Sequence, residues 1–164
     1  MAAYRIRKGE DRDLSLIFAF IKNLAEYEKM SDQVFADEDL LYEWLFEKKI
    51  AEVYFLMERE KEVAFVLFFH NFSTFQGRAG LYVEDIFVLP EYRGHGYGKA
   101  LFHWMAKIAI DRGCSRMEWT CLNWNEPSIR FYRSLGAVPM DQWILFRLTG
   151  PALEELGKGS ADER

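Results

Sequence analysis

The sequence has only two cysteines, Cys114 and Cys121, in 164 residues. Two cysteines are too few for the disulfide framework of a small secreted domain, and no Cys/His spacing typical of a zinc site accompanies them. We therefore expect both to be small buried residues of a cytoplasmic protein, where thiols stay reduced. The three histidines are scattered along the chain, so no metal site is predicted and no histidine is assigned a catalytic role.

Long apolar segments are also missing. The longest apolar run, Val63 to Phe69, is far too short to cross a bilayer and is typical of a buried strand. The N-terminal segment Met1 to Glu10 has no apolar stretch followed by a cleavage site, so no signal peptide is predicted. These absences argue against a membrane partner.

Basic residues are in the minority, because 21 Lys and Arg face 26 Asp and Glu, which gives a formal net charge of −5. Nucleic-acid affinity comes mainly from Lys and Arg that neutralise phosphates. The sequence has no basic stripe, and its aromatic-rich segment, residues 68–75, has few basic neighbours. Nucleic acid is therefore not the expected partner.

The chain does have the material for one substantial core. Half of its residues are hydrophobic and 16% are aromatic. By length it corresponds to about one domain, and no linker or internal repeat divides it. We expect a single domain over residues 1–156 and a loose polar tail over residues 157–164.

Hydrophobic periodicity predicts the order strand, two helices, three strands, helix, strand, helix, strand. The expected strands are residues 4–7, 53–57, 63–69, 81–89, 117–122 and 143–148. The expected helices are residues 14–27, a second one capped by Asp37, one that carries Leu101, Trp104, Met105 and Ile108, and residues 126–135. The three consecutive strands should be antiparallel, and the later ones joined by crossovers. This is an α/β (α+β) fold with a mixed central sheet flanked by helices.

The sharpest local motif is Arg93-Gly94-His95-Gly96-Tyr97-Gly98, which lies between an expected strand and an expected helix. Glycines let backbone N–H groups point inward, and the start of the helix adds unpaired N–H groups and a positive dipole end. Together they make a cradle for phosphate. The spacing fits neither a P-loop nor a Rossmann fingerprint. The alternative is a glycine-rich turn that binds no ligand.

Arg93-x-x-Gly96-x-Gly98 resembles the pyrophosphate-binding segment of the GCN5-related N-acetyltransferases, the GNAT family. The resemblance extends over nearly the whole chain to the diamine acetyltransferases of that family, which include the spermidine/spermine and thialysine acetyltransferases. Four segments carry it, namely LAEYE at 24–28, LYVEDIFV at 81–88, EYRG at 91–94 and WNEPSIRFY at 124–132.

This resemblance implies a GNAT fold and acetyl-CoA as the cosubstrate. The strand residues that would offer backbone to the pantetheine arm are Ile86, Phe87 and Val88. The residues that would hold the pyrophosphate are Arg93, Gly94, His95, Gly96, Tyr97, Gly98 and Lys99. The residues that would line the far side of the cofactor are Asn125, Glu126, Pro127, Ser128 and Leu135. Asn125 is also a good N-cap for the helix that begins after it, and both roles can hold at once.

Glu84 and Asp85 are adjacent carboxylates in an otherwise apolar strand. Neighbouring strand residues point to opposite faces, so at least one should face inward unless the sheet has a bulge. A buried carboxylate is costly without a partner. A cationic amine would be such a partner, and Glu84 could also accept its proton through water. The alternative is an internal ion pair with an arginine or a lysine.

The resemblance assigns the role of general acid to Tyr132, whose hydroxyl would protonate the departing thiolate. From its spacing alone, Tyr132 would be a packing residue. The resemblance also implies substrate contacts for Tyr27, Glu28, Glu84 and Asp85, for Glu118, Trp119 and Thr120, and for Asp141. Without it, Tyr27 and Glu28 would be a solvated helix end.

The expected function is therefore transfer of an acetyl group from acetyl-CoA to a primary amine by direct attack in a ternary complex. The acceptor is a small cation, either a diamine or polyamine or a lysine-like amino acid such as thialysine. A protein lysine, an acetyl-CoA sensor with little catalysis and a purely structural domain are the alternatives. The resemblance also implies a homodimer.

Overall fold

The computed structural model describes residues 3–159. The chain divides into two compact units, Met1–Leu122 and Asn123–Arg164. The predicted boundaries of the domain and its tail stay predictions.

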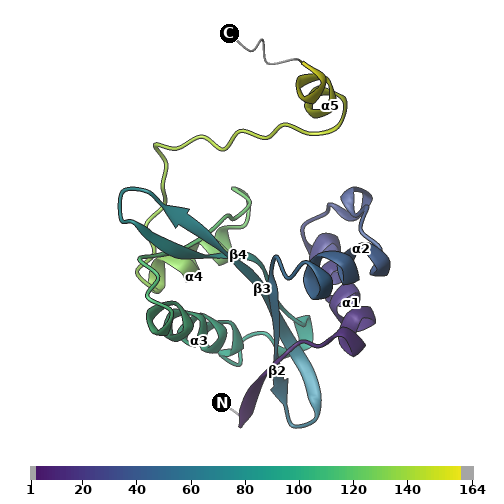
Figure 1. Cartoon of the computed structure of the whole chain (residues 1–164). Helices are drawn as coiled ribbons and strands as arrows, with labels where there is room; N and C mark the ends of the chain where they lie inside the picture. Colours follow the sequence, from purple (N-terminus) through teal and green to yellow (C-terminus); the bar gives the residue numbers. More distant parts are fainter. Residues whose placement is uncertain (1–2, 160–164) are drawn as a thin grey trace. The chain divides into compact units, whose positions relative to one another are not determined.

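The first unit is built on a five-stranded sheet (Figure 1). The strands are β1 (Tyr4–Lys8), β2 (Glu52–Glu58), β3 (Lys61–Ser73), β4 (Arg78–Val88) and β5 (Met117–Trp119), and their order in the sheet is β1-β2-β3-β4-β5. The first four strands pair antiparallel, while β5 pairs parallel to β4 after a helical crossover. The predicted mixed sheet, with its consecutive antiparallel strands, is confirmed.

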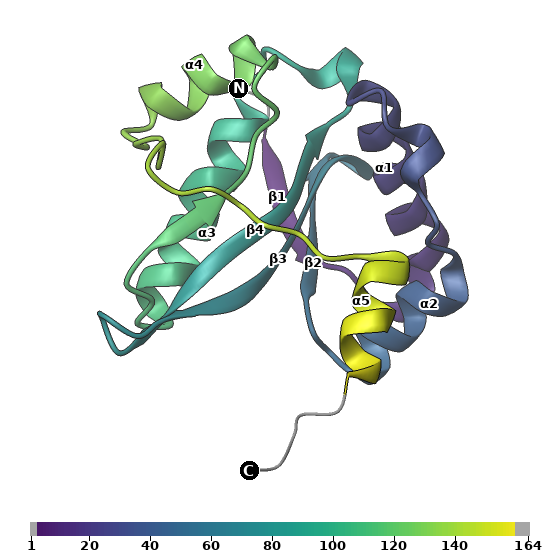
Figure 2. The ribbon, with the colours of Figure 1, turned by 90° about the horizontal axis from the view of Figure 1, so that it is seen from above.

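Helices cover the two faces of this sheet (Figure 2). One face carries α1 (Leu14–Tyr27) and α2 (Glu38–Tyr42), and α2 continues into η3 (Glu43–Glu47). The opposite face carries α3 (Tyr97–Asp111), the crossover between β4 and β5. Short helical turns complete the unit, namely η1 (Asp11–Asp13), η2 (Ser31–Gln33) and η4 (Pro90–Tyr92). The predicted cap of α2 is present, because Asp37 accepts a hydrogen bond of 2.8 Å from the backbone N–H of Leu40.

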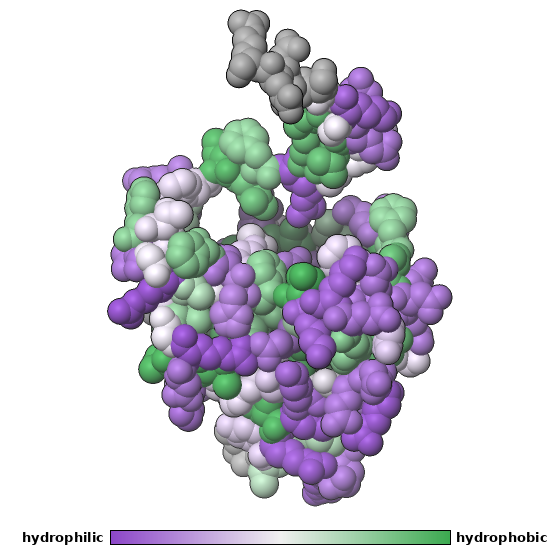
Figure 3. All heavy atoms as spheres, viewed as in Figure 1, coloured by the Kyte–Doolittle hydropathy of each residue, from purple (hydrophilic) through white to green (hydrophobic). Residues whose placement is uncertain are grey.

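The second unit contains α4 (Glu126–Ser134) and α5 (Gly150–Lys158). Figure 3 shows that α5 has hydrophobic residues on one side and hydrophilic residues on the other. The strand expected at residues 143–148 is not formed, so that prediction was wrong. A strand exists only by pairing with a neighbour, and an apolar pattern along the chain does not supply one. The start of the expected tail, residues 157–158, belongs to α5, and residues 160–164 lie outside the described residues.

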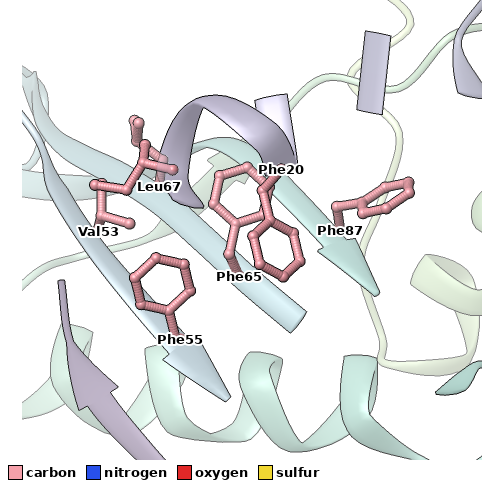
Figure 4. Close-up of a cluster of buried hydrophobic side chains, with 7 residues drawn as sticks. Phe20, Val53, Phe55, Phe65, Leu67 and Phe87 are labelled. Carbon is pink, nitrogen blue, oxygen red and sulfur yellow. The ribbon is translucent and has the colours of Figure 1, made fainter. Parts of the chain in front are cut away.

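The core between α1 and the sheet is a cluster of aromatic and aliphatic side chains (Figure 4). Phe20 of α1 lies with its ring centre 5.0 Å from that of Phe65 and 5.7 Å from that of Phe55. Phe87, near the end of β4, belongs to the same cluster. This packing fixes α1 over the end of β4, and that end is where the candidate site lies.

Candidate active site

Strand β4 has a bulge at Glu84. Leu67 of β3 pairs with Asp85 and the next residue, Phe68, pairs with Val83, so Glu84 has no partner on β3. A bulge puts two residues of one strand opposite one residue of the other and re-aims the side chains beside it. Glu84 is consequently exposed, while Asp85 is half-buried on the face that carries α1.

The same point in β4 marks the end of its pairing with β5. The parallel ladder joins Leu81–Val83 to Met117–Trp119, and β4 then continues to Val88 paired only with β3. Within residues 3–159, the edge of β4 from Glu84 to Val88 that faces away from β3 therefore has no paired strand. Unpaired strand edges present N–H and C=O groups to an extended ligand, as the amides of a pantetheine arm require. Ile86, Phe87 and Val88, predicted to offer this backbone, lie on that edge.

The glycine-rich motif forms the loop between η4 and α3. Gly94 has φ +80° and Gly96 has φ +84°, values that glycine adopts without steric cost. Gly96 is the N-cap of α3, and its carbonyl accepts a hydrogen bond of 3.0 Å from the N–H of Ala100. Gly98 and Lys99 lie in the first turn of α3, so their backbone N–H groups point toward the loop. This arrangement fits a phosphate group at a helix N-terminus.

The ring of Tyr97 anchors the loop instead of facing it. Tyr97 is buried, and its hydroxyl donates a hydrogen bond of 2.8 Å to Glu58 of β2. The ring of His95 stacks on it at 6.0 Å between centres. The side chain of Tyr97 therefore holds the start of α3 against the sheet. Only its backbone N–H is left for the predicted contact with pyrophosphate.

Arg93 connects the glycine loop to α1. Its Nε donates a hydrogen bond of 3.0 Å to the carbonyl of Val88, and its guanidinium lies 4.5 Å from the ring centre of Tyr27 and 5.1 Å from that of Phe87. Cation–π contacts of this kind hold an arginine in one place while leaving its outer N–H groups available. A surface pocket of about 460 Å³ opens beside it and is lined by Asn23, Glu26, Tyr27, Phe87, Leu89, Pro90, Glu91 and Arg93.

The carboxylates of Asp85, Glu84 and Glu28 influence one another. Burial, followed by the nearby charges of Glu84 and Glu28, raises the pKa of Asp85 to about 7. Burial also raises the pKa of Glu28. The expectation that both cysteines are buried was wrong, because Cys114 is half-buried and Cys121 is exposed. Partial desolvation of the Cys121 thiol, and then the charge of Glu28, still raise its pKa.

The internal ion pair considered for Glu84 and Asp85 is not formed. Among the ion pairs of the described residues, none includes either carboxylate. Like charges close together and partly out of water are unfavourable unless a cation joins them. The arrangement is therefore suited to bind a cationic group next to the bulge.

The three β5 residues predicted to contact substrate have different surroundings. Glu118 accepts a hydrogen bond of 2.8 Å from Asn71 and lies 2.9 Å from Arg116. Trp119 points to the other face and packs edge-on against Phe102 of α3, at 4.9 Å between ring centres. Thr120 follows the strand and is exposed. Glu118 thus shares the sheet face of Asp85, and Trp119 does not.

The remaining predicted residues belong to the second unit. Asn125 is buried and accepts a hydrogen bond of 3.4 Å from the N–H of Ser128, which makes it the N-cap of α4 as expected. Pro127 lies in the first turn, and Glu126 is 3.5 Å from Arg130. The ring of Tyr132 lies 5.5 Å from that of Phe131, Leu135 is the C-cap of α4, and Asp141 is exposed. Their roles toward the cofactor and substrate stay predictions.

The structure adds site residues that the sequence reasoning missed. Asn23 and Glu26 line the pocket beside Tyr27, one turn apart on α1. Asn23 lies three residues before Glu26 and four before Tyr27, and this helical spacing was a signal that could have placed Asn23 beside both. Asn71, a partner of Glu118, gave no such signal, because it lies on β3 and Glu118 lies on β5.

Comparison with known proteins agrees with this geometry. Residues 18–137 match the Acetyltransferase (GNAT) family, and the chain therefore belongs to that family. The thialysine N-epsilon-acetyltransferase of Bos taurus is 36% identical over 168 residues, which cover 95% of this chain and 98% of the relative. An L-ornithine N5-acetyltransferase of Arabidopsis thaliana is 45% identical over 94 residues, 57% of this chain and 41% of the relative.

A solved structure, an integron cassette protein from the mobile metagenome of V. cholerae, has a TM-score of 0.80 and 27% identity. It covers 97% of this chain and 100% of its own. The predicted family, fold class and acetyltransferase activity are confirmed. Among the described residues, no helix is long and apolar enough to span a membrane, and no group of His, Cys, Asp or Glu is arranged to hold a metal ion.

Proposed function

We propose that this protein acetylates a primary amine of a small cationic acceptor, with acetyl-CoA as the donor. The observation that carries this proposal is the coincidence of three features at one place in β4. These are the bulge at Glu84, the unpaired strand edge beyond it, and the half-buried carboxylate of Asp85, which lacks an internal cation.

The residues of the first unit fit acetyl-CoA. The edge of β4 at Ile86–Val88 would bind the amides of the pantetheine arm, and the loop from Arg93 to Gly96, with the first turn of α3, would bind the pyrophosphate. When bound, the cofactor supplies an activated acetyl thioester. Arg93 is already held beside the loop by Val88, Tyr27 and Phe87, so its outer N–H groups can approach phosphate at little entropic cost.

The carboxylates of Asp85, Glu84 and Glu28 would bind the acceptor amine and remove its proton. An alkylammonium has a pKa of about 10.4 and must lose a proton before its nitrogen can attack a thioester. Asp85 and Glu28 would hold the ammonium, and Asp85, with its pKa of about 7, is suited to accept the proton near neutral pH. Glu84, exposed at the bulge, would pass the proton to water.

We further propose Tyr132 as the group that protonates the departing thiolate. A phenol keeps its proton at neutral pH and can be held by its ring while its hydroxyl donates. The residues of the second unit that would contact the cofactor are Asn125, Glu126, Pro127, Ser128 and Leu135.

The named activities of the thialysine and ornithine relatives support an acceptor with an amine on a flexible side chain. We also propose a homodimer, with a mass near twice the 19.4 kDa of one chain by light scattering.

The test is a thiol-release assay with acetyl-CoA and a panel of amines that includes diamines, polyamines, lysine-like amino acids and a lysine peptide. We expect turnover with the small amines and little with the peptide. Tyr132→Phe should lower kcat by about 100-fold, the usual contribution of a general acid, and leave acetyl-CoA binding unchanged. If acetyl-CoA raises the melting temperature but no amine is acetylated, the protein is a sensor and the proposed function is wrong.

A further inference from the structure

The face of the sheet that carries Asp85 continues to a second group of polar residues. Cross-strand partners share a face, and Leu67 and Phe69, two residues apart on β3, point the same way. Leu67 pairs with Asp85, Phe69 pairs with Tyr82, and Tyr82 in turn pairs with Glu118 of β5. The side chains of Asp85, Tyr82 and Glu118 therefore lie in one row on this face.

Glu118 is held at one of its two oxygens. Nδ2 of Asn71 donates to Oε2 of Glu118 at 2.8 Å, and Nε of Arg116 lies 2.9 Å from the same Oε2. Gly80 makes room for this arrangement, because a Cβ there would lie 2.3 Å from Oδ1 of Asn71 and 3.1 Å from Cγ of Arg116. A hydrogen bond and an ion pair at the same oxygen hold the carboxylate in position.

The outer atoms of Arg116 and Glu118 make no hydrogen bond among the described residues. Among the hydrogen bonds of the described residues, none uses Oε1 of Glu118 or an Nη atom of Arg116. The side chains are 38% exposed for Arg116 and 35% for Glu118. A carboxylate oxygen thus lies beside the fork of a guanidinium, and both are accessible. This pair is complementary to an ammonium and a carboxylate on one ligand.

The spacing fits a ligand with a second amine. Along the sheet face, Asp85 is two β3 positions from Tyr82, about 7 Å, and Glu118 lies one strand further, about 5 Å across. Tyr82, stacked against Phe69 at 5.0 Å between ring centres, provides an apolar surface between the two ends. A side chain of the length of lysine or ornithine is on the scale of this row.

We infer that Arg116 and Glu118 form a subsite for the head group of an α-amino acid acceptor. Arg116 binds the α-carboxylate, Oε1 of Glu118 accepts a hydrogen bond from the α-ammonium, the methylene stem lies over Tyr82, and the side-chain amine reaches Asp85. A diamine has a cation at both ends and no carboxylate, so Arg116 disfavours it. The inference rests on the proposed function and narrows its acceptor to an amino acid with an amine on its side chain.

The test compares acceptors that differ only in the carboxylate, namely ornithine against putrescine and lysine against cadaverine. We expect Arg116→Gln to lower kcat/KM for the amino acids by about 10- to 100-fold, the effect of removing a hydrogen bond to a charged group, and to leave the diamines unchanged or improved. Arg116→Lys, which keeps the charge without the fork, should recover part of the loss.

Arg112→Gln is the matched control. Arg112 makes an ion pair with Glu52 on another part of the first unit, so its loss should lower the melting temperature without changing the ratio between amino acid and diamine. If Arg116→Gln also changes only the melting temperature, the cluster is structural and the inference is wrong. If the wild type acetylates none of these four compounds and no other small amine of the panel, the proposed function itself fails and the inference with it.

Discussion

The two halves of strand β4 differ in construction although they are continuous. From Arg78 to Val83 the strand is paired with β3, and its last three residues also pair with β5. From Glu84 to Val88 one edge is open, the register is shifted by a bulge, and a half-buried carboxylate lies on the α1 face. The first half supports the fold, and the second half leaves backbone groups and charge available to ligands. One inserted residue separates the two roles.

Phe65→Ala should have the largest effect, and on stability alone. Phe65 is fully buried on β3 under Phe20, and truncation of a buried phenylalanine costs about 3–5 kcal/mol, because transfer free energy is lost and a cavity is left. Urea unfolding measures this loss. A change below about 1 kcal/mol would mean that this part of the sheet is not the main support of the fold.

Asp85→Asn should raise the free energy of unfolding, whereas Phe65→Ala lowers it. The pKa of Asp85 rises from its ordinary value of 3.8 to about 7 on folding, so the folded state binds more protons than the unfolded state between these values. Wild-type stability is therefore lost as pH rises through this window. Asparagine does not ionise, so the variant should become more stable than the wild type, by a margin on the order of 2–4 kcal/mol above pH ~7.

Unfolding of both proteins across this pH range checks the expectation. The margin should be small below pH ~4, where the carboxyl is protonated in both states, and constant above pH ~7. A variant that is less stable than the wild type at alkaline pH would contradict the burial of a carboxylate without an internal cation.

Arg93→Ala should have the smallest of these effects, on cofactor affinity. The guanidinium lies beside the glycine loop, and loss of a charge-assisted contact to phosphate should weaken acetyl-CoA binding by about 10- to 100-fold. Isothermal titration measures the affinity, and Arg5→Ala, an exposed pair with Glu60, is the control. Unchanged affinity would remove Arg93 from the phosphate site.

The sequence predicted the helix caps and the glycine loop, which depend on a few neighbouring residues. Asp37 and Asn125 are caps, and the positive φ values of Gly94 and Gly96 are those that a phosphate-binding loop requires. These features depend on a few neighbouring residues, so a single sequence contains them. The adjacent pair Glu84 and Asp85 could likewise be singled out before any pairing was known.

The parts that depend on distant residues could not be predicted. The bulge at Glu84 depends on the register with β3, and the contacts of Glu118 depend on Asn71 of another strand. The strand expected at residues 143–148 was wrong for the same reason, since strand pairing is non-local. The sequence therefore predicted local caps and turns better than it predicted which residues meet across the sheet.

The most direct measurement is thiol release from acetyl-CoA with a small amine acceptor, for the wild type and for Asp85→Asn, from pH ~6 to ~9. The account predicts that wild-type kcat/KM rises as Asp85 loses its proton near pH 7 and that the variant is at least about 100-fold slower while it still binds acetyl-CoA. A variant as active as the wild type at every pH would contradict the claim that the open half of β4 is the active site.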